Sequence, residues 1–521
     1  MHRSTVWFAV LSSLVFLIGF VGCSHGRSPV TPGEGDRGAQ NFSQSRQVFG
    51  IPGDNTVFRD LDLATLVDGF SGLTSGLPSV LQFAGQPHSF AVQVSLQHIA
   101  GQGQVPWLAW LMDNPSPGSQ PTIVDRMIFG IPSGTGLQLK FPKVDAIYRP
   151  GVDPAHSDVI VAVSFMLRIT GEAQYGLGVI FMHWSAEAFL DGQIGMYDDH
   201  YYVLYNPSYM GNPEDAYVWG QDLAFNPDDG DLYVVYTNNE SPGSPHAWKL
   251  HYFRISQQYP DFIWVRNGPW LAFTGGWEMN AWLPSVDIGI LDIHPGGPRW
   301  TVGVAFTAQD HPETPDESDF IVAGNSWPAG PAYDGDHTNT DYHMCVTAPA
   351  GLNCGLPELD IAIYYPGTSI PFYAMAYAQE NPVTGHDVMV MDSINEAPWR
   401  VARDENDVTE RILPSIATHL FSWERKASVS CYKWVSEEGR FKPAGYRMNL
   451  AVPDSYYENE QVVQFGYDGV WGPWAPLNVA FADVGLATDI VMQTQNTYFM
   501  GFANSVLEYP ARVYVAWGST Q

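Results

Sequence analysis

Short runs of β-forming residues separated by turn residues recur along this chain, and helical periodicity is almost absent. A small polar residue, usually Asp, is followed by mostly apolar residues, a Pro/Gly/Asp turn and a second apolar run. These units start at Ser89, Asp145, Asp222, Asp287, Asp360, Ser415 and Asp489. The starting residues are separated by 56, 77, 65, 73, 55 and 74 positions, and a third apolar run often follows the second. The pattern predicts an all-β repeat protein of short strands joined by hairpins.

The repeat resembles the seven-bladed β-propellers of secreted bacterial lipoproteins, without matching a specific functional family. The resemblance implies seven blades of about four antiparallel strands, formed by residues 47–521 as a single domain. Residues near 328–357 are expected to be an insertion, and an outer strand at 45–53 is expected to complete the last blade. The segment 54–87 has no place in this scheme. An array of β-sandwich domains is the alternative fold.

The N-terminus reads as an export signal followed by a lipid attachment site. Residues 1–22 have a weakly basic start and an apolar core that is shorter than the roughly 20 residues of a spanning helix. The following Cys23 completes a sequence that resembles the bacterial lipobox, and an ordinary secretory signal is the alternative. Residues 23–46 are then a lipidated, flexible tether. We expect an exported lipoprotein in the outer membrane or on the cell surface, because Ser24 follows the cysteine.

The charge of the chain limits its partners. The formal net charge is −31, while charged residues make up only 15% of the chain. An acidic surface repels phosphate backbones, so nucleic acid is excluded as a partner, and contact with a membrane would rest on the lipid anchor. A protein or a polysaccharide at the cell surface is the expected partner.

The four cysteines indicate no haem or zinc motif. Cys345 and Cys354 lie nine positions apart in a loop-like stretch and are suited to a small disulfide in an oxidising compartment. Cys431 alternates with apolar residues, which predicts a buried thiol.

The stretch "FNPDDGDLYVVYTN" at 225–238 has the acid density of a calcium loop. If Gly230 occupied the sixth position of an EF-hand loop, Pro227 and Phe225 would occupy the third and first positions, which need oxygen ligands. The same place in the other repeats shares only Pro and Gly turn residues. We therefore predict a hairpin turn between the first two strands of the third unit.

The aspartates at the start of the repeats are the stronger candidates for a shared role. In a propeller the first strand of each blade faces the central channel, so these carboxylates would form a ring. Each is expected to accept backbone N–H groups and to attach its blade to the next. The alternative is a calcium site at the channel mouth, because clustered carboxylates are hard ligands. The candidate ring residues are Asp145, Asp222, Asp287, Asp360 and Asp489.

A second group of possible ligands lies in the predicted insertion. Asp334, Asp336 and Asp341 are suited to calcium, and His337 and His343 to a transition metal. A solvated loop held by the disulfide is the alternative. Asp198, Asp199 and His200 before another strand are explained equally well by a polar turn.

The tryptophans suggest stacking on sugar rings. Trp270, Trp277 and Trp282 lie in a Gly-rich stretch, interpreted as the connection between units three and four, and Trp471 and Trp474 precede unit seven. Trp399 precedes unit six, so recurrence at equivalent places favours a packing role over glycan contact. Glu278 is the one carboxylate suited to acid catalysis, although glycosidic cleavage needs a second one.

Taken together, the sequence favours a non-enzymatic envelope lipoprotein that binds protein or glycan on one propeller face. The motifs GxSxG, HExxH and the P-loop are absent from the sequence. A secreted carbohydrate-active enzyme, either a glycoside hydrolase or a lyase, is the alternative. A structural subunit of an envelope assembly is a third possibility.

Overall fold

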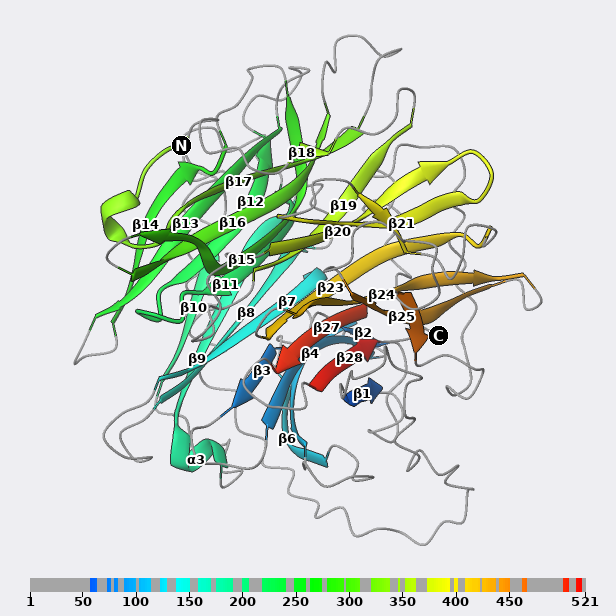
Figure 1. The fold of residues 1–521 in the computed structure, drawn as a ribbon. Coiled ribbons are helices and arrows are strands. Elements are labelled where there is room, and N and C mark those ends of the chain that lie inside the picture. Colours follow the sequence, from blue (N-terminus) through cyan, green and yellow to red (C-terminus); the bar gives the residue numbers. More distant parts are fainter. Residues whose placement is uncertain are drawn as a thin grey trace, which may run out of the picture.

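The computed structural model describes strands between Val57 and Trp517 and side chains in parts of residues 142–436 (Figure 1). The predicted signal peptide, Cys23 and the tether lie outside the described residues. In the residues that the structure describes, the chain is all-β apart from a short helix α3 (Ala186–Leu190) and a 3-10 turn η4 (Pro331–Tyr333). In the described part, no helix is both long and apolar enough to cross a membrane.

The strands group into sheets that follow one another along the chain. Sheet 1 contains β2 (Leu73–Ser75), β3 (Ser79–Gln82), β4 (Ser89–Ile99), β5 (Gly103–Asp113) and β6 (Thr122–Ile128). Sheet 2 contains β7 (Leu137–Arg149), β8 (Asp158–Ile169), β9 (Gly176–Ser185) and β10 (Asp199–Tyr205). Sheet 3 contains β11 (Val218–Phe225), β12 (Leu232–Asn239), β13 (Trp248–Gln258) and β14 (Ile263–Leu271). Sheet 4 contains β15 (Asn280–His294), β16 (Gly297–Gln309), β17 (Phe320–Pro328) and β18 (Cys345–Val346).

The remaining sheets complete the series. Sheet 5 contains β19 (Cys354–Ile361), β20 (Tyr373–Asn381), β21 (Gly385–Asp392) and β22 (Trp399–Arg400). Sheet 6 contains β23 (Arg411–Phe421), β24 (Glu424–Val435), β25 (Arg440–Asn449) and β26 (Val462–Phe465). Sheet 7 contains β27 (Met500–Ser505), β28 (Arg512–Trp517) and β1 (Val57–Asp62). None of these sheets closes on itself in the described strands.

Most sheets are antiparallel meanders, as the hairpin pattern predicted. Sheets 2 to 6 each have four strands that pair in chain order. The starting residues of these units lie in β7, β11, β15, β19 and β23, which confirms the assignment of first strands. Asp489, the last starting residue, lies outside the described residues.

Sheet 7 joins the two ends of the chain. β1 lies parallel to β28, with Val57 opposite Arg512, while β27 and β28 are antiparallel (Figure 1). The sequence analysis placed the strand that completes the last blade at 45–53, which lies outside the described residues. In the structure, β1 pairs with β28. The previously unassigned segment 54–87 contains β1, β2 and β3.

The predicted insertion near 328–357 is partly regular structure. It contains η4, the two-residue strand β18 and the first residues of β19. β18 pairs with β17, with Cys345 opposite Ala323, and so forms the fourth strand of sheet 4. The sequence pattern missed this strand because two residues carry no periodicity.

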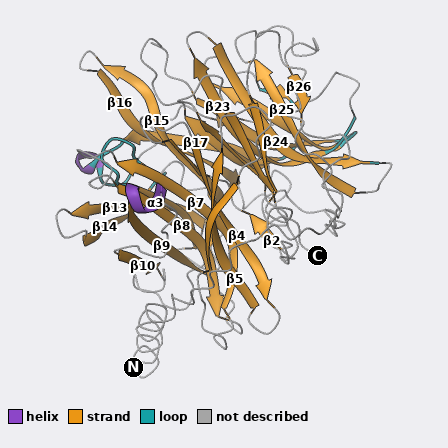
Figure 2. Ribbon diagram, turned by 90° about the horizontal axis from the view of Figure 1, so that it is seen from below, coloured by secondary structure: helices purple, strands orange, loops and turns teal. Residues whose placement is uncertain are grey.

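From sheet 2 to sheet 6, where side chains are described, each sheet packs on the next around an apolar cluster. One cluster joins Ile147 and Ile160 of sheet 2 to Leu223 and Phe253 of sheet 3. Equivalent clusters lie between sheets 3 and 4, between sheets 4 and 5, and between sheets 5 and 6. The second strand of a sheet is apolar over a long run because the sheets on either side cover both of its faces, as in β12. Figure 2 shows the sheets lying side by side.

The packing between sheets 4 and 5 leaves no room for a side chain at Gly289 of β15. A Cβ there would lie 2.4 Å from Ile361 Cγ2 and 2.7 Å from the Ile361 carbonyl oxygen. A Cβ at Gly303 of β16 would meet only side chains, at 2.6 Å from Cδ1 of the same isoleucine and 3.1 Å from Leu359 Cδ2. The two glycines thus set the distance between the sheets, and only Gly289 faces main chain.

Gly289→Ala is therefore expected to lower the free energy of unfolding by about 2 kcal/mol, since the backbone of β19 must move. Gly303→Ala serves as the matched control and is expected to cost about 1 kcal/mol or less, because a side chain can rotate away. Urea unfolding followed by tryptophan fluorescence measures both. Equal costs for the two variants would contradict this description of the sheet contact.

Candidate functional site

Four of the predicted aspartates attach each sheet to the next through backbone hydrogen bonds. Phe225 N donates to Asp145 Oδ2 at 2.7 Å, and Val286 N donates to Asp222 Oδ2 at 3.0 Å. Ile361 N donates to Asp287 Oδ2 at 2.5 Å, and Thr418 N donates to Asp360 Oδ2 at 2.7 Å. In the first three, the second oxygen accepts the N–H of the following residue. These contacts confirm the predicted attachment of one unit to the next.

The first strands of sheets 2 to 6 each contain a β-bulge, which changes the face on which the following side chains lie. The pairing register shifts at equivalent places in β7, β11, β15, β19 and β23. Leu283, Leu356 and Leu413 have φ angles of 50°, 56° and 51° there, a conformation that leucine rarely adopts. Each is followed by proline, and the next residue is Ser285, Glu358 or Ser415.

The residues after the bulges meet in a polar cluster that we call the axial cluster: Lys143, Asp222, Ser285 and Glu358. Lys143 Nζ lies 3.1 Å from Glu358 Oε1 and 3.8 Å from Asp222 Oδ1. Ser285 Oγ donates to Glu358 Oε2 at 3.2 Å and accepts the N–H of Leu359 at 3.0 Å. The cluster joins sheets 2, 3, 4 and 5, although 215 positions separate Lys143 from Glu358 in the sequence.

The environment of the first strands shifts the pKa values of these groups. Burial, opposed by Lys143, raises the pKa of Asp222 to about 6. Burial, opposed by hydrogen bonds from Thr418, raises the pKa of Asp360 to about 6. Burial and the neighbouring Asp360 carboxylate raise the pKa of Asp287 well above its ordinary value. For Lys143, burial lowers the pKa, but the carboxylates of Asp222 and Glu358 outweigh it and leave a net increase. Lys143 is therefore an ammonium ion between carboxylates.

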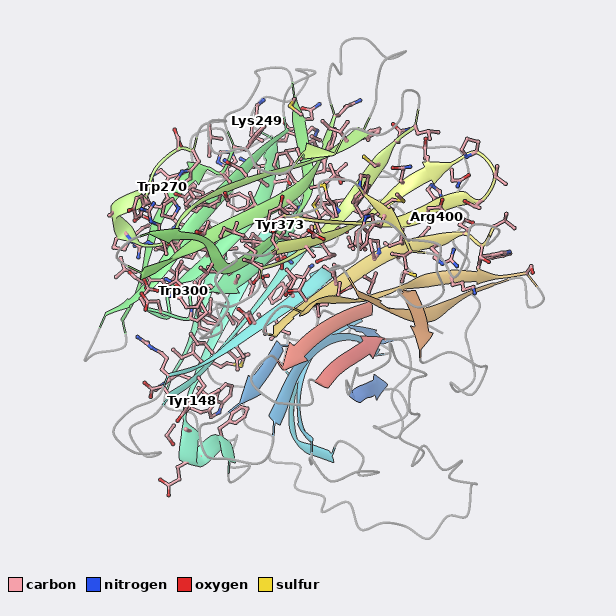
Figure 3. The ribbon with its side chains drawn as sticks, in the orientation of Figure 1. Tyr148, Lys249, Trp270, Trp300, Tyr373 and Arg400 are labelled. Carbon is pink, nitrogen blue, oxygen red and sulfur yellow. The ribbon has the colours of Figure 1, made fainter. Side chains whose placement is uncertain are left out.

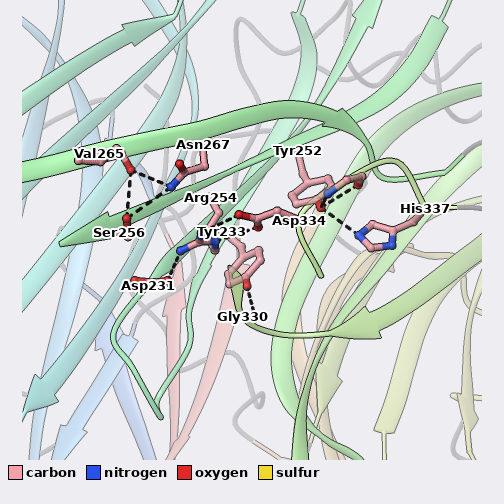
Figure 4. Close-up of polar contacts among 11 residues, drawn as sticks. Asp231, Tyr233, Tyr252, Arg254, Ser256, Val265, Asn267, Gly330, Asp334 and His337 are labelled. Atoms are coloured by element: carbon pink, nitrogen blue, oxygen red, sulfur yellow. Dashed lines mark hydrogen bonds and ion pairs between the residues drawn. The ribbon is translucent and has the colours of Figure 1, made fainter. Parts of the chain in front are cut away.

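A second polar cluster attaches the segment 329–337, which we call the strap, to sheet 3 (Figure 4). The guanidinium of Arg254 on β13 forms an ion pair with Asp231 and donates to both carboxylate oxygens of Asp334, at 2.9 and 2.6 Å. Tyr252 Oη donates to the Gly335 carbonyl at 2.9 Å and lies 2.9 Å from His337 Nε2.

Further contacts hold the strap along the outer strands of the sheet. The His337 ring stacks on Trp327 at 4.3 Å between centroids, and the backbone N–H of His337 donates to the Leu271 carbonyl at 2.9 Å. Leu271 N donates to Asp336 Oδ1 at 2.8 Å. The three strap residues predicted as metal ligands, Asp334, Asp336 and His337, thus hold the strap in place.

The other metal predictions have different outcomes. Asp341 and His343 lie outside the described residues, as do the side chains of Asp198, Asp199 and His200. Among the described side chains, no three His, Cys, Asp or Glu are placed together to hold a metal ion. Calcium therefore remains a prediction.

The stretch at 225–238 forms the predicted hairpin between β11 and β12. Gly230 N donates to the Asn226 carbonyl at 2.8 Å, and Gly230 has a φ angle of 77°. Asp229 Oδ1 accepts Asp231 N at 2.9 Å, within the turn. Asp231 has a role that the sequence did not indicate, because its carboxylate pairs with Arg254.

Those candidate tryptophans whose side chains the structure describes, Trp270, Trp282 and Trp399, are packed against protein. Trp270 lies in β14 rather than in a connection between units, half-buried beside Tyr252 at 5.4 Å between ring centroids (Figure 3). Trp282 is 7% exposed and packs on Phe320, so it has no face for a sugar. Trp399 is buried in β22, as the packing interpretation predicted. Trp277, Trp471, Trp474 and Glu278 lie outside the described residues.

The cysteine predictions are tested in part. Cys431 is buried in β24, as the alternation indicated. Cys354 is buried at the start of β19, and the side chain of Cys345 lies outside the described residues. The disulfide between them stays a prediction.

Two structural signals in the sequence were missed. The first is the order apolar–Pro–x–apolar–Asp, found at 141–145, 283–287 and 356–360, which marks the bulge and the side chain that follows it. The second is an asparagine seven positions before Asp287 and Asp360. Asn280 Oδ1 accepts Trp248 N at 3.1 Å, and Asn353 Oδ1 accepts Phe320 N at 2.9 Å, so each fixes the third strand of the preceding sheet.

Comparison with known proteins gives no family. No family model matches the sequence, and no curated protein matches it. Solved structures with a similar fold include the Hadza microbial sialidase Hz136, with 8% identity, 67% of this chain and 66% of that chain covered, and a TM-score of 0.33. The chain thus spans less than two thirds of the sialidase.

Two further structures belong to the same comparison. The parainfluenza virus 5 hemagglutinin-neuraminidase ectodomain has 8% identity, coverage of 73% and 82% of the two chains, and a TM-score of 0.38. The Aleuria aurantia lectin in complex with Fucalpha1-6GlcNAc has 11% identity, coverage of 73% and 97%, and a TM-score of 0.31. At these TM-scores, the likenesses carry no argument about the ligand of this chain.

Proposed function

We propose that this chain is a seven-bladed β-propeller lipoprotein of the cell envelope that binds a glycan or a protein partner on one face. The lipid on Cys23 would anchor it, and residues 23–46 would hold the propeller away from the membrane. The chain's acidic charge makes a nucleic-acid partner unfavourable.

Contacts between neighbouring sheets support the ring. The inner strands touch in the order β4, β7, β11, β15, β19, β23 and β27, and β27 also contacts β3 of sheet 1. The strands β27 and β28, red in Figure 1, lie beside the blue strands of sheet 1 and the orange strands of sheet 6. Pairing of β1 with β28 would tie both ends of the chain into the seventh blade.

The observation that carries the binding proposal is that the polar side chains on the inner strands hold one another. Both oxygens of Asp222 and of Asp287 accept backbone N–H groups, and both oxygens of Glu358 are bonded within the axial cluster. Because these carboxylates already bond to protein groups, they stabilise a rigid scaffold, and ligand recognition would fall to the loops at its ends. A platform of this kind suits binding better than acid–base catalysis.

A glycan array probed with the secreted chain carrying Cys23→Ser, with and without calcium, tests the proposal. We expect saturable binding to a restricted set of glycans and no change in the bound glycan after long incubation. The heat-denatured chain is the control for adsorption. If no glycan binds, a protein partner is expected instead, and cross-linking on intact cells tests for it. If neither experiment detects a partner, the proposed binding function is contradicted.

A carbohydrate-active enzyme is the second candidate, favoured by the raised pKa values of Asp222 and Asp360. Carboxyl groups that hold a proton near pH 6 are suited to general acid catalysis. Release of reducing sugar from a glycan that the array identifies would favour this candidate. Activity that survives Asp222→Asn and Asp360→Asn would place catalysis elsewhere.

A further inference from the structure

The inner strands bring more carboxylates together than the contacts between them neutralise. The Asp287 carboxylate on β15 accepts the N–H of Ile361, the residue after Asp360 on β19, so the two carboxylates repel each other, and Asp145 on β7 adds to the negative potential at Asp287. The Glu358 carboxylate likewise adds to the negative potential at Asp222. Lys143 lies 3.8 Å from Asp222 and 3.1 Å from Glu358, and it is their ion-pair partner in this cluster.

Water cannot stabilise these charges well, because the inner strands pack closely. Asp222 is 6% exposed, and Asp287 and Asp360 are half-buried. Ionising all of these carboxylates would place several like charges together in a medium of low polarity. If one carboxyl group keeps its proton, one of these negative charges is removed, and one hydrogen bond from a backbone N–H to that group becomes weaker.

Other charged groups on the strands packed against them are engaged elsewhere. Arg149 donates to the Asp229 carbonyl at the end of β7, and His183 of β9 pairs with Asp158 of β8. Arg411 of β23 donates to the Thr409 carbonyl, and Glu380 of β20 accepts Asn353 N.

We propose that the axis of this protein is a proton-binding site: the inner-strand carboxylates Asp222, Asp287 and Asp360 take up protons as the sheets assemble. Mild acid therefore tightens the contacts between sheets 3, 4, 5 and 6, and rising pH loosens them. This inference rests on the ring arrangement of the proposed function but not on any ligand.

The sign follows from the direction of the pKa shifts. All three groups have a folded-state pKa above the ordinary value of 3.8, and for Asp222 and Asp360 it is about 6. The folded state then binds more protons than the unfolded chain between about pH 4 and 7. Their contribution to stability is fully present below the ordinary pKa and is lost as the pH rises through 6.

The direct test uses the full chain carrying Cys23→Ser, unfolded by urea in weakly buffered solution at pH 6. We expect a net release of about one to two protons per chain, because Asp222 and Asp360 are each about half protonated at this pH and Asp287 adds at most one proton. Proton uptake, or no exchange, would overturn the inference. This readout is independent of glycan or protein binding, so a negative result on the array does not affect it.

Variants identify the groups. Stability measured by urea unfolding should rise as the pH falls from 8 to 5, and Asp222→Asn and Asp287→Asn should each flatten that rise by reducing the protons exchanged. Asp228→Asn, on the exposed tip of the β11–β12 hairpin, is the matched control and should keep the wild-type profile. If a variant does not fold, proton release from the parent chain still decides the matter. A slope unchanged in both axial variants would contradict the assignment.

Discussion

Lys143→Met is expected to lower the free energy of unfolding by about 3 kcal/mol at pH 8. The substitution keeps the length of the side chain and removes its charge. Asp222 and Glu358 then lose the ammonium ion 3.8 and 3.1 Å away and remain as like charges in the packed centre. Urea unfolding followed by tryptophan fluorescence measures the loss.

The pH dependence of this variant separates electrostatics from packing. At pH 5, Asp222 takes up a proton because its pKa is about 6, so the loss is expected to be smaller than at pH 8. Lys249→Met is the matched control, since Lys249 Nζ donates to one carbonyl oxygen, that of Met279, at 3.1 Å. An equal loss at both pH values would show that the loss does not depend on the charge of Asp222.

Arg254→Met is the second large effect, with an expected loss of about 3 kcal/mol at neutral pH. Asp231 and Asp334 would remain beside each other without the guanidinium that pairs with both. Burial already raises the pKa of Asp231 to about 6 in the presence of Arg254, so the variant should recover part of its stability in mild acid.

The location of this loss is also testable. Limited proteolysis should cut the Arg254→Met variant within residues 329–337 faster than the parent chain, because the strap loses its main ionic contact. Arg266→Met on the neighbouring strand β14 is the control, since Arg266 is exposed and its loss is expected to cost about 0.5 kcal/mol or less. Cleavage of the strap at the same rate in all three proteins would show that its aromatic and backbone contacts suffice.

The sequence predicted the local parts of this fold well. Alternation of apolar residues and the Pro and Gly turns are properties of neighbouring positions, so first strands and hairpins were placed correctly. The hairpin after Phe225 and the attachment role of Asp287 are examples. The short strand β18 and the position of Trp270 within β14 were missed, because neither has a periodic signal of its own.

Contacts between distant parts of the chain could not be predicted in the same way. Arg254 and Asp334 are 80 positions apart, and their pairing depends on how a loop of sheet 4 lies on sheet 3. Lys143 and Glu358 lie in sheets 2 and 5, and the contacts that link these sheets run through β11 and β15. A single sequence gives no information on such pairs, so the acidic residues of the strap were considered as possible metal ligands.

The most direct test of a ring with a shared axis is a double-mutant cycle between Lys143 and Glu358. Lys143→Met, Glu358→Gln and the double variant are compared by urea unfolding at pH 8 and low salt. The arrangement predicts a coupling energy of about 1–3 kcal/mol between these residues of sheets 2 and 5. A coupling energy of about zero, with both single variants folded, would contradict a common axis for these sheets.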